Sequence, residues 1–62
     1  MDNAAFLNSQ VACAMIEAMG MKAENEKRKA MGEYPIYFQQ DFQALISKYQ
    51  IGYNDALLIL RG

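Results

Sequence analysis

The segment VACAMIEAMGMKAENEKRK, residues 11–29, begins apolar and rich in methionine and ends almost entirely charged. Residues 2–31 contain no proline and many strong helix formers. Asp2 or Asn3 can cap the start of a helix, and Gly32 suits its end. We therefore predict one helix over about residues 3–31, buried in its first half and solvated in its second.

The same segment does not fit an export signal or a membrane span. No Lys or Arg precedes Val11, and the apolar run that begins there stops at Glu17. A membrane-spanning helix needs about 20 mostly apolar residues, which this chain does not offer. A single cysteine suits a reducing compartment, and we expect Cys13 to be a small buried residue. The sequence predicts a cytoplasmic protein without membrane association.

The apolar residues of the first half recur at steps of four and three, which is the spacing of a coiled-coil seam. The seam positions are Leu7, Val11, Ala14, Ala18 and Met21. Apolar residues also occupy other sides of this half, and a helix that is apolar nearly all round is a buried one. We expect this half to be packed on more than one side.

Two shorter helices are expected after Pro35, which is suited to open the first of them. Apolar residues recur at helical spacing over about residues 36–49. Asn54 is a good N-cap for a last helix over about residues 54–61, and Gly52 is free to adopt positive φ in the turn before it. The predicted fold is a single all-α domain over residues 1–62.

A chain of 62 residues buries only about 60% of its unfolded surface, so its core is marginal. Small domains gain support from disulfides, a metal or oligomerisation. One cysteine forms no disulfide within the chain, and one cysteine without histidine does not make a zinc site. Oligomerisation remains, so we predict a helical homodimer. The predicted interface consists of Leu7, Val11, Ala14, Met15, Ala18, Met21, Leu57 and Leu58.

The sequence contains no histidine, no nucleophile motif, no phosphate-binding loop and no carboxylate pair at metal-ligand spacing. We predict a protein that is not an enzyme and uses no cofactor or metal. Exposed methionine and tyrosine suit binding to another protein, whose identity stays open, although the same residues also serve as ordinary core. The candidate partner-binding residues are Met19, Tyr34, Tyr37 and Tyr53.

The segment FQALISKYQIGYNDALLILRG, residues 42–62, resembles the helix-turn-helix of phage repressors. Leu45, Ile51 and Ile59 fall on the buried positions of that motif, but Gln50 stands where the turn usually has glycine. The resemblance implies a DNA-binding regulator. Its candidate DNA contacts are Lys27, Arg28, Lys29, Tyr53, Asn54 and Arg61. Six basic residues face seven acidic ones, so a helix-turn-helix shape used for packing is favoured over nucleic-acid binding.

The whole chain, short and methionine-rich, is similar to the small accessory proteins of temperate phages and prophages. This resemblance implies a non-enzymatic modulator that binds a host or phage protein. We expect a protein-interaction module that acts as a homodimer. The alternatives are the DNA-binding regulator and a small structural subunit of a larger assembly.

Overall fold

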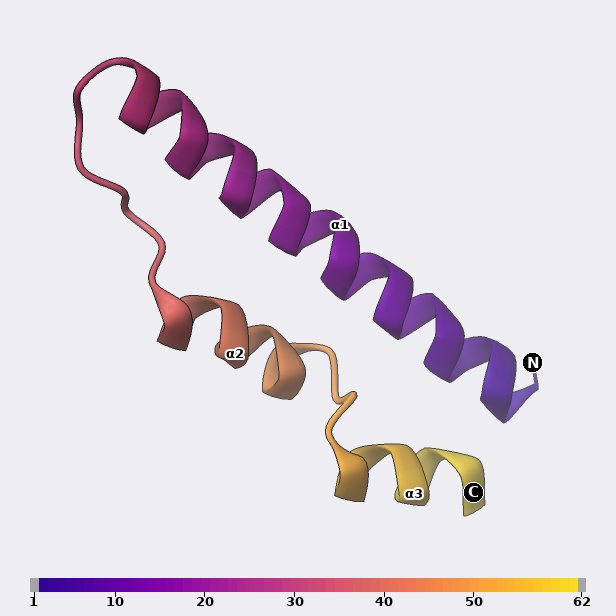
Figure 1. The fold of residues 1–62 in the computed structure, drawn as a ribbon. Coiled ribbons are helices and arrows are strands. Elements are labelled where there is room, and N and C mark those ends of the chain that lie inside the picture. The colour runs from indigo at the N-terminus through magenta and orange to yellow at the C-terminus, as the bar shows by residue number, and fades with distance from the viewer. Residues whose placement is uncertain (1, 62) are drawn as a thin grey trace.

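The chain folds into a helical hairpin in which one long helix is covered along one side by two short ones. A computed structural model describes residues 2–61. Helix α1 spans Asn3–Ala30, α2 spans Gln39–Lys48 and α3 spans Tyr53–Arg61. The chain turns back after α1, so that α2 and α3 follow one another in the opposite direction (Figure 1). The described residues contain no strand, and the predicted all-α class is confirmed.

Both ends of α1 are closed by local hydrogen bonds. Asp2 is the N-cap, and its Oδ1 accepts the N–H of Ala4 at 3.1 Å. At the other end Gly32 adopts a left-handed φ of 76°. The N–H groups of Gly32 and Glu33 donate to carbonyls of the last turn at 3.0 and 2.8 Å, which is a Schellman motif. The predicted helix over about residues 3–31 is therefore confirmed.

The second helix begins three residues later than predicted. Pro35 does not open it, because residues 33–38 are non-helical, with a bend at Ile36, and the N-cap is Phe38 at φ −117° and ψ 178°. The Oδ2 atom of Asp41 accepts the N–H of Phe38 at 2.8 Å and closes the first turn. The predicted start at residue 36 is wrong, since the backbone of Ile36 and Tyr37 is bound to α1 instead.

The turn between α2 and α3 places its left-handed residue at Gln50, with a φ of 55°, and not at Gly52 as predicted. Gln50 donates to the carbonyl of Ser47 at 3.2 Å, and Ile51 donates to that of Ile46 at 3.0 Å. These two bonds form a second Schellman motif. Gln50 thus occupies the position at which the repressor turn usually carries glycine.

The start of α3 also differs from the prediction. The helix begins at Tyr53, and the carbonyl of Gly52 accepts the N–H of Ala56 at 2.8 Å. Gly52 is therefore the residue before the helix, and Asn54 lies inside the first turn without capping it.

The molecule is a single layer of helices, because α2 and α3 each pack on α1 and not on one another. It measures 47 × 19 × 10 Å, and the shortest extent is comparable to the thickness of one helix. In a helix-turn-helix the two helices pack together at a steep angle. The resemblance of residues 42–62 to that motif therefore does not extend to its packing.

The core is correspondingly small. Among the described residues, only Ala14, Met21 and Leu45 are buried. They lie where α2 returns along α1. Within residues 2–61, no helix has the length and apolarity needed to cross a bilayer.

Candidate protein-interaction surface

The predicted seam of α1 faces the returning half of the same chain. Ala14 and Met21 are buried against it without a second copy, and Leu7 and Ala18 are half-buried. The polar residues on the same side of α1 bind α2 and the segment before it. The predicted seam positions therefore lie on a packing face of α1, but α2 and α3 of the same chain cover much of this face, and the predicted contact with a second copy stays a prediction.

A hydrogen-bonded cluster around Glu17, which we call the Glu17 clamp, ties α1 to the end of α2. The Glu17 carboxylate accepts bonds from Lys48 Nζ at 2.7 and 3.0 Å and from Tyr49 Oη at 2.6 Å. The hydrogen bond from Lys48 is the largest cause of a lowered pKa of Glu17, and the bond from Tyr49 is the next largest. The same bonds raise the pKa of Lys48 and the pKa of Tyr49. Gln10 Nε2 adds a bond to the Tyr49 carbonyl at 3.1 Å. The clamp fixes the register of α2 on α1.

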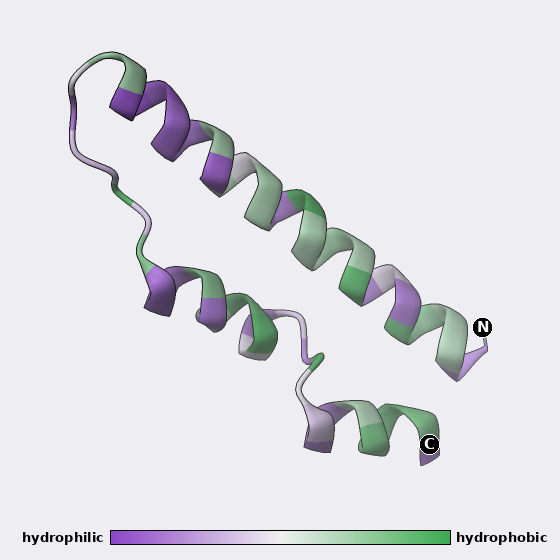
Figure 2. Cartoon of the chain, in the orientation of Figure 1, coloured by the Kyte–Doolittle hydropathy of each residue, from purple (hydrophilic) through white to green (hydrophobic). Residues whose placement is uncertain are grey.

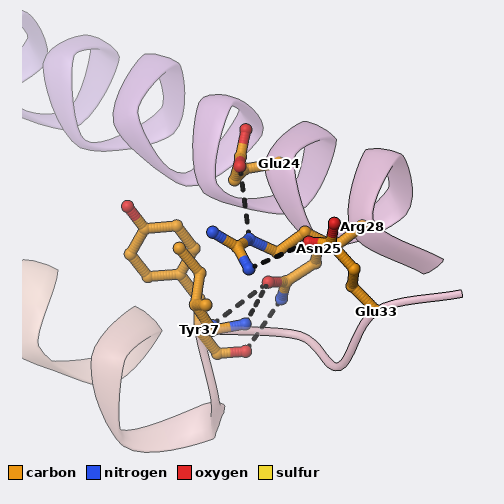
Figure 3. A network of polar contacts seen from close by, with 6 residues as sticks. Glu24, Asn25, Arg28, Glu33 and Tyr37 are labelled. Carbon is orange, nitrogen blue, oxygen red and sulfur yellow. Dashed lines mark hydrogen bonds and ion pairs between the residues drawn. The ribbon is translucent and has the colours of Figure 1, made fainter. Parts of the chain in front are cut away.

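Asn25 ties the connecting segment to α1 near the other end of the hairpin (Figure 3). Its Oδ1 accepts the N–H groups of Ile36 and Tyr37, both at 3.1 Å, and its Nδ2 donates to the Tyr37 carbonyl at 2.8 Å. The side-chain amide thus satisfies three backbone groups of this bent, non-helical segment. We call these three bonds the Asn25 lock.

Arg28 reinforces the same end of the hairpin. Its Nε bonds Glu24 and its Nη1 bonds Glu33, each at 3.3 Å. The first is the pair expected from i,i+4 spacing in a helix. The second closes the connecting segment onto α1.

With the register fixed, side chains of both arms frame an apolar groove on one side of the hairpin. The groove is lined by Val11, Ala14, Met15, Ala18, Phe42, Leu45, Ile46 and Ile51, none of which is charged or polar. Met15 on one wall is 60% exposed, and Ile46 on the other is 47% exposed. Figure 2 shows the apolar half of α1 opposite the end of α2 and α3. The groove is therefore an apolar surface that the fold leaves partly uncovered.

The opposite side of the hairpin has a different character. A larger groove of about 520 Å³ lies there, lined by Glu17, Gly20, Met21, Tyr37, Asp41, Ala44, Leu45 and Lys48. Only Leu45 lines both grooves. Successive residues of a helix are rotated by about 100°, so Met15 and Glu17 lie on opposite sides of the buried Ala14. This agrees with Met15 lining the apolar groove and Glu17 lining the larger one. The lining of one groove is therefore uncharged and apolar, and the lining of the other includes Glu17 and Lys48 of the clamp.

Helix α3 is apolar and poorly covered. None of its described residues is buried, and Leu57, Leu58 and Leu60 are all exposed. Together with Val11 and Met15, Leu57 and Leu58 are the predicted interface residues that remain accessible in the single chain. The α3 surface therefore extends the apolar area beyond the groove.

The four predicted partner-binding residues do not form one site. Met19, Tyr34 and Tyr53 are exposed, but Tyr37 is half-buried by the Asn25 lock. Tyr34 lies in the connecting segment, whereas Tyr53 begins α3 (Figure 1). The groove residues of α2 were missed as a site, although their helical spacing was recognised, because the spacing does not show which of them α1 covers.

The predicted DNA contacts are not brought together either. Lys27, Arg28 and Lys29 lie in the last turn of α1, whereas Arg61 ends α3 beside the opposite end of that helix (Figure 1). Arg28 is already paired with two carboxylates. Cys13 is exposed, which corrects the prediction that it is buried.

Within the described part of the chain, no group of three or more His, Cys, Asp or Glu residues is placed to hold a metal ion. Comparison with protein-family models, curated proteins and solved structures finds no match to this chain.

Proposed function

We propose that the chain is a non-enzymatic protein-interaction module, working in the manner of small phage and prophage accessory proteins in the cytoplasm. It acts by burying its apolar groove against another protein surface. The observation that supports this proposal is the groove itself, which has apolar walls with Val11, Met15 and Ile46 exposed and no charged lining residue.

The groove offers binding energy at low cost. Met15 and Ile46 are about half exposed, so covering the rest of each contributes roughly 1 kcal/mol, about half the value for full burial, and no charged lining residue has to lose water in the process. The Glu17 clamp and the Asn25 lock hold the two walls before a partner arrives. A preformed site loses less conformational entropy on binding than one that must be ordered.

Site-specific photo-crosslinking tests the proposal. A benzoylphenylalanine replaces Met15 in the groove or, as a control, Lys27 in the charged half of the same helix. Cells producing each variant are irradiated, and adducts are separated by size. We expect a discrete adduct to a protein from Met15 and none from Lys27. Adducts from Met15 no stronger than those from Lys27 would contradict the proposal.

A pair of substitutions on α2 shows whether the groove itself makes the contact. Ile46→Asp places a charge on the groove wall, whereas Gln43→Asp places one on an exposed position of α2 outside the lining. We expect Ile46→Asp to abolish the Met15 adduct and Gln43→Asp to leave it. Circular dichroism of both proteins controls for folding.

A further inference from the structure

We infer that the occupant of the apolar groove is a second copy of this chain, which stacks face to face on the first in a two-fold symmetric dimer. This inference rests on the proposed function, because it names the partner of the same groove. Three properties of the molecule point to a second copy.

The first property is exposed area. A compact monomer of 7.0 kDa exposes about 4,000 Å², whereas this chain exposes 4876 Å². The excess is roughly 850 Å², close to the roughly 800 Å² that each partner buries in a protein interface of standard size. One copy therefore leaves open about the area that one interface would cover.

The second property is thickness. Stable domains are built from at least two packed layers of secondary structure, and this chain supplies one layer with a shortest extent of 10 Å. Two copies stacked through the groove complete a two-layer helical bundle with helices at the usual spacing of about 8–10 Å.

The third property is charge. In a two-fold interface the same patch meets itself, so a charged residue close to the axis lies near its own like charge. The apolar groove has no charged lining residue, whereas the opposite groove contains Glu17, Asp41 and Lys48. Self-association through the apolar groove therefore meets no repulsion between charged lining residues, and the exposed side chains of Met15 and Ile46 are available for contact with the second copy.

Sedimentation equilibrium over low to high micromolar concentration tests the inference. We expect the wild-type chain to be a dimer, and Met15→Glu and Ile46→Glu each to raise the dimer Kd at least about a hundredfold by burying unpaired charge. Ile16→Glu is the matched control, because Ile16 is the neighbour of Met15, is 70% exposed and lies outside the groove. We expect this control to change the Kd by less than about threefold.

A second measurement uses the wild-type protein, in case the groove variants fail to fold. Uniformly ¹³C-labelled copies are mixed with unlabelled copies, and NOEs from ¹³C-bound to ¹²C-bound protons, which arise only between copies, are recorded. We expect contacts from the Met15 methyl to Phe42 or Ile46 of the other copy, and none from Met31. Contacts from Met31 without any from Met15 would place the interface elsewhere and overturn the inference.

The outcomes separate this inference from the proposed function. A wild-type monomer at all concentrations, with a Met15 photo-adduct to a different protein, overturns the second copy and leaves the interaction module intact. A monomer without any Met15 adduct overturns both. A dimer that survives both groove variants but is lost in Ile16→Glu overturns the choice of face.

Discussion

Glu17 accepts three hydrogen bonds across the hairpin, and these bonds favour its ionised form. Because the pKa of Glu17 is lowered in the folded chain, the clamp stabilises the fold above the ordinary pKa of 4.5 and loses this effect as pH falls through the folded pKa. The pKa values of Lys48 and Tyr49 are raised, so their contributions are present below about pH 10 and lost above it. The clamp thus acts throughout the neutral range.

We expect Glu17→Gln to flatten the acid side of this profile. The amide keeps an acceptor for Lys48 or Tyr49 but has no charge to titrate, so the variant is less stable than wild type at neutral pH and converges on it in acid. Urea midpoints measured by circular dichroism between neutral pH and about pH 3 check this. Glu26→Gln is the control, since no bond to α2 involves Glu26. A wild-type and variant difference that stays constant with pH would rule out the clamp.

Asn25 holds three backbone groups of the connecting segment, and its loss leaves all three to water. We expect Asn25→Ala to lower the free energy of unfolding by roughly 2 kcal/mol, given about 1 kcal/mol or less for each partly exposed bond. The neighbouring Glu26→Ala should cost less than about 0.5 kcal/mol. Hydrogen exchange at the amides of Ile36 and Tyr37 gives the local readout. Unchanged protection at both amides in Asn25→Ala would contradict the lock.

At the scale of elements, two helices end in the same motif with different residues at its left-handed position. Gly32 adopts this conformation without strain, whereas the Cβ of Gln50 crowds the neighbouring carbonyl there and costs free energy. We expect Gln50→Gly to stabilise the chain by about 0.5–1 kcal/mol and Gly32→Ala to destabilise it by about 1 kcal/mol. Chemical denaturation of both variants checks the opposite signs. Two changes of the same sign would contradict the shared geometry.

The helices themselves were largely predictable, because helix formers, Asp2 and Gly32 act within a few residues of chain. Errors arose where distant residues decide the local structure. Pro35 is suited to start a helix, but Asn25 binds the backbone just after it and holds that backbone in a non-helical conformation. In the turn after α2 the left-handed residue is the one that follows the C-cap, Tyr49, and this is Gln50. Gly52 lies two residues further along and so does not take that position.

At the scale of the whole molecule, the seam in α1 shows what spacing alone leaves open. Apolar residues at steps of four and three require a helical neighbour, but a second copy and the rest of the same chain satisfy the spacing equally well. The deciding contacts join residues far apart in sequence, such as Glu17 with Lys48 and Gln10 with Tyr49. The groove follows only once these contacts set the register, so its α2 wall could not be assigned from the sequence.

The geometry of a face-to-face dimer gives a further prediction. The single chain has a Cα radius of gyration of 14.5 Å, well above the roughly 10–11 Å of a compact chain of this length, because it is long and flat. Stacking a second layer about 10 Å away doubles the mass but raises the radius of gyration by only about 1 Å. An end-to-end dimer through the connecting segment or the termini would increase it far more.

Small-angle X-ray scattering over a concentration series measures the mass and the radius of gyration at once. We expect the forward intensity per unit concentration to double as the dimer forms, while the radius of gyration stays nearly constant. Ile46→Glu should keep the monomer intensity throughout the series, and Ile16→Glu should follow the wild type. A doubling of mass with a large rise in radius would mean that the copies meet at their ends, and the apolar groove would then be left for a different protein.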